Sequence, residues 1–127
     1  MNIKRIFLLI NILFFIYFAV QLLLFTDEFA LSNIGFFNHA VAGLAEIIGI
    51  IFLSFSFAII VIFFKGIERQ FPFFLSIFLI QFIIGLNFLR YVFTNSPGET
   101  SLEIIIFNAI LFSIASIFSL YLLVKSK

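Results

Sequence analysis

The stretch AVAGLAEIIGIIFLSFSFAIIVIFF, residues 40–64, contains a single charged side chain, Glu46. A helix rises about 1.5 Å per residue, so about 20 apolar residues cross the roughly 30 Å hydrocarbon core of a bilayer. Strands are excluded, because no alternation of polar and apolar residues runs through the stretch and only closed barrels satisfy strand backbones in lipid. The stretch therefore predicts a membrane-spanning helix.

Three further stretches have the same character, at residues 6–25, 72–93 and 97–124. The whole chain of 127 residues is 65% hydrophobic and only 10% charged, proportions far from those of soluble domains. We predict an all-α integral membrane four-helix bundle, with residues 1–127 forming a single transmembrane domain. The first stretch is longer than the apolar core of a signal peptide, so we expect it to be retained.

The charges outside the spans predict the orientation of the bundle. Four crossings place all the basic residues of the termini and of the link between spans two and three on one side of the membrane. Asp27, Glu28 and Glu99 fall on the other side. By the positive-inside rule both termini then lie in the cytoplasm, and the protein is a multi-pass protein of the cell membrane. The basic residues are Lys4, Arg5, Lys65, Arg69, Lys125 and Lys127.

Residues 96–99, Ser-Pro-Gly-Glu, have the pattern of a helix start, with Ser as N-cap, Pro in the first turn and Glu closing a capping box. Span four then begins near Pro97, with Leu102 as the later alternative. A start at Pro97 places Glu103 about 9 Å inside the helix, between the levels of Arg90 and Asn87 in span three. We therefore expect a salt bridge between Arg90 and Glu103.

Other polar residues lie at a similar depth. Asn87 is one turn from Arg90 on the same helix face. If Asn38 caps span two, Glu46 lies about eight residues inside it, with His39 at the membrane edge. We predict a polar layer in the half of the bundle away from the termini, which binds a ligand. Its members are Glu46, Asn87, Arg90, Glu103 and His39, with Asn108 only marginal because it lies about 140° of helix rotation from Glu103.

Two carboxylates face one guanidinium in this polar layer. A buried carboxylate without a partner tends to take up a proton, so Glu46 is the candidate proton or cation site. The structural alternatives are that Arg90 extends to lipid headgroups, that Glu103 complements the helix dipole, and that His39 is a solvated interfacial residue. One histidine without cysteines is a poor metal site, so we expect neither metal nor cofactor.

Two further features bear on the packing of the spans. Asn11, Gln21 and Gln81 are predicted to form hydrogen bonds between helices, and the abundant phenylalanines to fill the core and face lipid. Residues 26–38 form the only connection with room for structure. Their apolar side chains predict a segment lying on the membrane interface.

Three segments carry a resemblance to a known family: NHAVAGLAEIIG at 38–49, NFLR at 87–90 and SPGETSLE at 96–103. In these segments and in length the chain resembles the DoxX-like group of small four-span bacterial membrane proteins, over a region from about Asn38 to the end. The resemblance implies a four-span fold in the bacterial inner membrane and an association with quinone-linked or sulfur-oxidation complexes. His39 and Glu46 stand where an Arg is expected, so a site in span two does not transfer.

Phosphate loops, nucleophile elbows and zinc motifs are absent from the sequence, and the few basic residues are scattered, which argues against an enzyme and against nucleic-acid binding. We predict a ligand-binding or accessory subunit. Its partners would be the lipid bilayer, a lipid-like or quinone-like ligand, and a second copy or a larger membrane complex.

Three alternatives stay open. One is a small proton- or cation-coupled transporter that dimerises through small-residue faces at Gly43, Gly49 and Gly85. Another is a structural or assembly protein. The last is an intramembrane enzyme that uses Glu46, Glu103 or His39 on a lipid-like substrate.

Overall fold

The structure is a computed structural model that describes residues 2–95 and 100–127. These residues form five helices and no strands, which confirms the predicted all-α fold. Four helices are long and apolar enough to cross a membrane, so the chain is a small polytopic membrane protein. The helices are α1 (Ile3–Leu24), α2 (Thr26–Asn33), α3 (His39–Lys65), α4 (Phe71–Thr94) and α5 (Leu102–Lys125).

Local signals set where the long helices begin. The side chain of Asn38 accepts a hydrogen bond of 2.8 Å from the backbone N–H of Val41, which confirms the predicted cap of α3. Pro72 lies in the first turn of α4, where its missing N–H costs nothing. α5 begins at Leu102, the later of the two predicted starts, so Glu103 lies in its first turn instead of well inside the helix. The predicted capping box at 96–99 lies outside the described residues.

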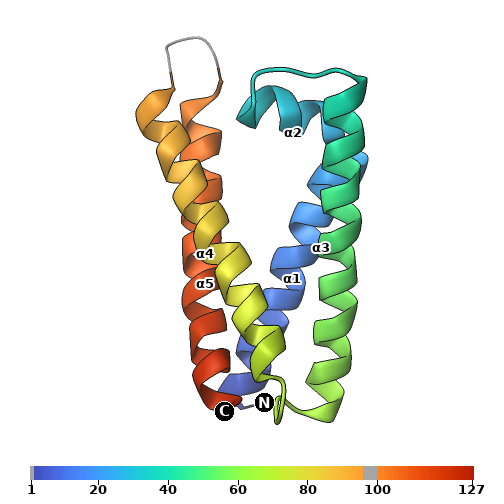
Figure 1. Ribbon diagram of the computed structural model, residues 1–127, viewed down its shortest axis with the longest axis vertical. Coiled ribbons are helices and arrows are strands. Elements are labelled where there is room, and N and C mark those ends of the chain that lie inside the picture. Colours follow the sequence, from blue (N-terminus) through green and yellow to red (C-terminus); the bar gives the residue numbers. More distant parts are fainter. Residues whose placement is uncertain (1, 96–99) are drawn as a thin grey trace.

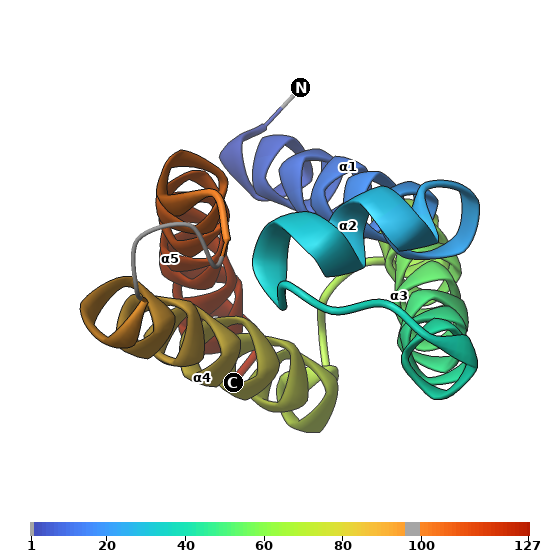
Figure 2. The same cartoon turned by 90° about the horizontal axis from the view of Figure 1, so that it is seen from above.

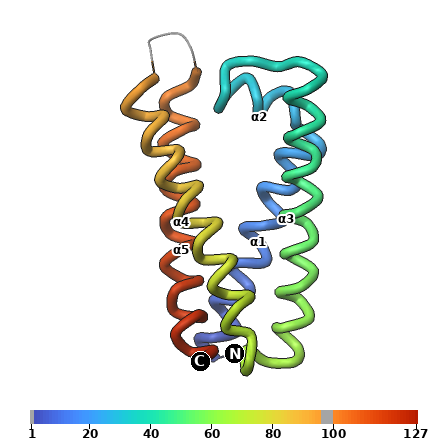
Figure 3. The backbone as a smooth tube through the Cα atoms, in the orientation of Figure 1, coloured from blue at the N-terminus to red at the C-terminus, as the bar shows by residue number. Residues whose placement is uncertain are grey.

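The long helices form two antiparallel pairs, α1 with α3 and α4 with α5. Figure 1 shows the N- and C-termini and the α3–α4 connection at one end, here called the terminal end, and α2 at the other, here called the α2 end. The pairs approach each other toward the terminal end and diverge toward the α2 end (Figure 3). No Cα atom of α3 lies within 8 Å of one of α4, so only side chains join these two helices.

The short helix α2 turns back over the bundle. The Thr26 hydroxyl donates a hydrogen bond of 2.6 Å to the carbonyl of Leu22 where α1 gives way to α2. α2 ends at Asn33, and Gly35, two residues later, has a φ of 82° that suits glycine and lets its N–H donate to the Ala30 carbonyl. Seen from above, α2 lies over the space between the two pairs (Figure 2). The segment predicted to lie on the interface thus contains a helix that packs against α1, α3 and α5.

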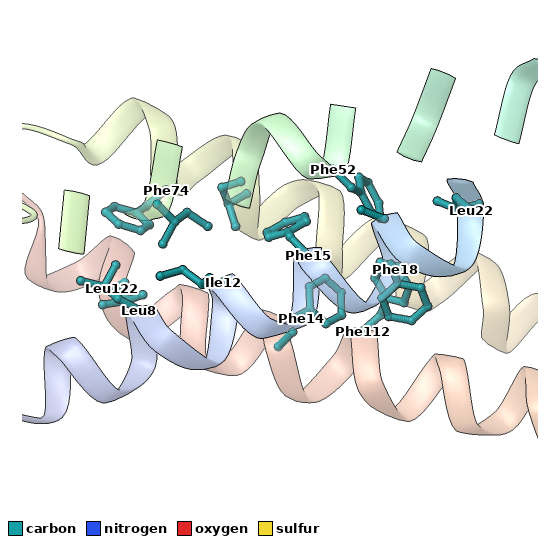
Figure 4. Packing of buried hydrophobic residues seen from close by; sticks show 14 of the residues in the cluster. Leu8, Ile12, Phe14, Phe15, Phe18, Leu22, Phe52, Phe74, Phe112 and Leu122 are labelled. Carbon is teal, nitrogen blue, oxygen red and sulfur yellow. The ribbon is translucent and has the colours of Figure 1, made fainter. Parts of the chain in front are cut away.

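Phenylalanine side chains fill the core, as predicted (Figure 4). The ring of Phe112 on α5 packs against Phe14 and Phe18 of α1, with centroid distances of 4.9 and 4.6 Å. It also contacts Phe88 of α4 at 5.5 Å and Phe52 of α3 at 6.4 Å. Edge-to-face and tilted aromatic pairs add to apolar burial. One side chain thus joins both helix pairs midway along the bundle.

Two of the glycines proposed for a dimer face serve contacts inside the chain. A Cβ on Gly49 would lie 2.8 Å from Leu23 Cγ, so α3 approaches α1 closely only because this position lacks a side chain. A Cβ on Gly85 would lie 3.4 Å from the Cβ of Phe112 in α5. Gly43 has nothing within 4 Å, which leaves it as the one member of the proposed face that is free in this chain.

Candidate functional site

The five residues predicted to form the polar layer are not in the interior of the bundle. Glu46, Asn87, Arg90, Glu103 and His39 are all exposed on the single chain. On α4 the buried residues lie on one side, and Arg90 points away from them. The same holds for Glu103 on α5. The expectation of an interior charged layer is therefore not met, because helix rotation turns its charges outward.

Arg90 and Glu103 also do not form the salt bridge expected between them. The guanidinium carbon of Arg90 lies 5.5 Å from the ring centre of the adjacent Tyr91, and no ion pair joins it to Glu103. With α5 starting at Leu102, Glu103 sits where its charge complements the positive end of the helix dipole, one of the structural roles considered above.

The polar groups that are buried are amides and hydroxyls. At the first of two centres, Gln81 Nε2 donates a hydrogen bond of 2.9 Å to Asn11 Oδ1. The Ser119 hydroxyl lies 2.9 Å from the same Asn11 oxygen and in close contact with Gln81 Oε1, to one of which it donates. All three are at most 1% exposed. This buried polar cluster joins α1, α4 and α5, and it confirms the predicted interhelical bonding of Asn11 and Gln81. Gln21, half-buried, is not part of it.

The second centre lies at the α2 end and consists of two asparagines. Asn108 Nδ2 of α5 donates a hydrogen bond of 2.7 Å to Asn33 Oδ1 of α2, and Asn33 Nδ2 donates to the carbonyl of Phe29. Both side chains are buried. This asparagine pair attaches α2 to α5.

For one member of this pair, Asn108, the sequence already indicated a different orientation from that of Glu103. The 140° rotation that made Asn108 marginal in the polar layer is the reason that it is buried while Glu103 faces outward. Asn33 was missed, because it lies in a segment for which no helix was predicted.

A cavity of about 240 Å³ lies between the two helix pairs beneath α2, here called the central cavity. Its walls are mostly apolar, with Phe18, Phe52 and Phe88 among them, and its polar lining comes from Asn33, Asn87 and Tyr91. Asn87 is thus the one member of the predicted polar layer that borders it. Two cavities adjoin this region: one of about 340 Å³ beside Gln21, Glu28 and Asn108, and one of about 240 Å³ beside Thr94, Asn95 and Thr100. Asn33 lines all three.

The central cavity can hold and orient a molecule. Two amides and a phenol at one part of a largely aromatic pocket provide both donors and acceptors for a polar group, while the rings accommodate an apolar one. No acidic, basic or histidine side chain lines it among the described residues. The arrangement therefore favours binding over acid–base chemistry.

Comparison of the chain with protein-family models, curated proteins and solved structures gives no match.

Proposed function

We propose that the protein binds a lipid-like, amphipathic molecule in the central cavity. The observation that carries this proposal is a largely aromatic pocket with its few polar groups, Asn33, Asn87 and Tyr91, placed at the α2 end of the bundle. A molecule with an apolar body and a small polar head matches this lining, and a quinone-like ring is one such molecule. Ligand sites in helix bundles commonly have this composition.

We infer that a ligand enters the central cavity between α3 and α4, because Ile48 of α3 and Asn87 of α4 both line it and are exposed on the single chain. These two helices do not pack backbone to backbone, and Phe29 and Asn33 of α2 line the cavity at its end. A ligand dissolved in the bilayer would therefore enter sideways from the membrane. This access favours a hydrophobic ligand over a water-soluble one.

The proposal also covers how the protein is oriented in the membrane and in which membrane it lies. The terminal end carries the basic residues of the termini and of the α3–α4 connection, whereas Asp27 and Glu28 lie in α2 at the other end. The positive-inside rule then places the terminal end in the cytoplasm and the central cavity toward the outer leaflet. A setting in the bacterial inner membrane and kinship with the DoxX-like group form part of the same proposal.

The experiment uses the full chain in nanodiscs and a single-chain fatty acid with a photoreactive diazirine near its end. Labelling is expected at residues 29–34 and 84–91, mapped by mass spectrometry of peptides. Ile84→Trp fills the central cavity and should remove most of this labelling. Ile83→Trp is the matched control, because Ile83 is exposed and lies outside the cavity, and it should leave the labelling unchanged. Equal labelling in the two variants would refute the proposal.

A second candidate function, an assembly subunit of a membrane complex, rests on the outward charges. Glu46 and Arg90 lie within the spanning helices and are exposed on the single chain, where lipid is a costly environment for a charge. A partner that supplies opposite charges would remove this cost. Glu46→Gln together with Arg90→Gln should then abolish recovery of the complex on native gels without unfolding the chain. No observation in the described residues favours the transporter or the enzyme.

A further inference from the structure

We propose that a second cavity, at the terminal end between α1 and α3, binds the headgroup phosphate of an anionic phospholipid. This basic cavity has a volume of about 270 Å³ and is separate from the central cavity. It is lined by Lys4 and Arg5 at the start of α1 and by Lys65 at the end of α3, together with Glu68 of the connection. The proposal is therefore independent of the ligand of the central cavity.

The charge of the basic cavity selects an anion. Three cations against one carboxylate leave a net charge of +2 on its lining. Arg offers paired N–H donors that match phosphate oxygens, and Lys adds a compact positive charge. Glu68 can accept a hydrogen bond from a donor elsewhere on the headgroup. A phosphodiester that carries a hydroxyl group, as in phosphatidylglycerol, satisfies both requirements.

Several contacts hold the lining in place. The Arg5 guanidinium carbon lies 5.2 Å from the centre of the Phe63 ring, which fixes the cation against α3. Gly66 caps the C-terminal end of α3 with a φ of 105°, and a Cβ at this position would clash with the Glu68 carboxylate. The missing side chain therefore lets Glu68 turn back toward the helix end. Ile67, only 3% exposed, anchors the connection in the core.

The apolar part of the same cavity favours a lipid over free phosphate. Leu8, Ile62, Phe63 and Phe64 line it below the charged residues. Phe64 is 75% exposed, so the surface beside the cations is open and hydrophobic. The cavity lies at the ends of two helices that can span a membrane, which is where phospholipid headgroups are found. An acyl chain could then run along the exposed surface while the phosphate meets the cations.

The test uses a fluorescent reporter in vesicles. The chain has no tryptophan, so Phe64→Trp places a single reporter in the basic cavity. The full chain is reconstituted into phosphatidylcholine vesicles that contain a minor fraction of brominated phosphatidylglycerol or, in parallel, of brominated phosphatidylcholine. We expect the phosphatidylglycerol to quench the reporter far more than its share of the lipid predicts.

Two charge-matched triple variants of the reporter protein decide the outcome. K4Q/R5Q/K65Q removes the cations of the basic cavity and should lower the relative affinity for phosphatidylglycerol on the order of tenfold or more. R69Q/K125Q/K127Q removes three cations from the same end that do not line the cavity, and it should keep the preference. Both variants need the helical circular dichroism of the parent. Equal losses in the two would refute the site and leave only a general surface charge effect.

A competition with inorganic phosphate tests whether the basic cavity binds a phospholipid headgroup or free phosphate, since both present the same anionic group. Added to the vesicles at millimolar concentration, it should leave the quenching by brominated phosphatidylglycerol unchanged. Release of the quenching in the parent reporter, but not in K4Q/R5Q/K65Q, would mean that the cavity takes free phosphate, and would overturn the lipid proposal.

Discussion

The terminal half and the α2 half of the bundle differ in how their buried polar side chains are paired. In the terminal half, Asn11, Gln81 and Ser119 form hydrogen bonds between the two helix pairs and are fully buried. In the α2 half, the asparagines bond α5 to α2 instead, and the helix pairs diverge around the central cavity. Both halves are rich in apolar residues. We infer from this difference that the few buried amides, together with the apolar packing, set where this bundle closes.

The physical reason is that lipid exerts little hydrophobic force on helix association. Helices in a bilayer are held together by packing and by hydrogen bonds between polar side chains. A side-chain amide has to find a partner, because leaving it unpaired in an apolar interior is costly. Asn11 of α1 bonds across to Gln81 of α4 where the pairs meet, whereas Asn108 of α5 bonds to Asn33 of α2 where the pairs diverge.

The largest effect is expected where α1 and α3 touch, because their tight pairing keeps one wall of the central cavity in place. Gly49→Leu inserts a side chain where even a Cβ would meet Leu23 at 2.8 Å. Overpacking of this kind should lower the free energy of unfolding by about 3 kcal/mol, measured by circular dichroism during titration with SDS. Gly43→Leu is the control and should change stability little, since nothing lies within 4 Å of Gly43.

The variant Asn11→Leu tests whether the buried polar cluster holds the two helix pairs together in the terminal half. This variant leaves Gln81 Nε2 buried without its acceptor, and the cost should be about 2 kcal/mol in the same unfolding assay. Ser54→Ala is the control, because Ser54 is exposed and bonds only to the carbonyl of Ile50 in its own helix. Equal stability of the two variants would show that the buried polar cluster does not hold the pairs together.

The α2 end is tested by Asn108→Ala, which removes the bond from α5 to α2. We expect a local loss of about 1 kcal/mol, seen as roughly fivefold faster amide hydrogen exchange in Thr26–Asn33. The terminal half of α1 should be unaffected. Ser113→Ala removes a hydroxyl that bonds within α5 and should leave exchange in α2 unchanged. Faster exchange along the whole chain would mean that the asparagine pair stabilises the entire bundle.

The smallest effect is expected for the exposed charged side chains of Arg90 and Glu103. A double-mutant cycle on Arg90→Gln and Glu103→Gln should give a coupling energy below about 0.5 kcal/mol, because the two side chains are exposed and unpaired with each other. A cycle on Asn33→Ala and Asn108→Ala provides the comparison and should give a clearly larger coupling. A clearly larger coupling energy would show that Arg90 and Glu103 do form the salt bridge predicted from the sequence.

Much of the fold could be predicted from local sequence patterns. Each long helix was predicted from length and hydrophobicity, and the cap at Asn38 from its side chain and position. The interhelical roles of Asn11 and Gln81 were also predicted, because an amide in an apolar span needs a partner. The polar layer was placed inside the bundle because its residues share a depth, but depth alone does not specify the direction in which a side chain points.

The sequence by itself determined that this is a four-span helical membrane protein, because span length and backbone satisfaction in lipid depend only on local composition. The tertiary structure decided how each helix is rotated. That rotation turned Glu46, Arg90 and Glu103 outward and Asn108 inward. It also brought Asn33 of α2 against Asn108 of α5 and left the central cavity between the two helix pairs beneath α2. Rotation depends on how all the helices pack at once, so only the assembled bundle determines it.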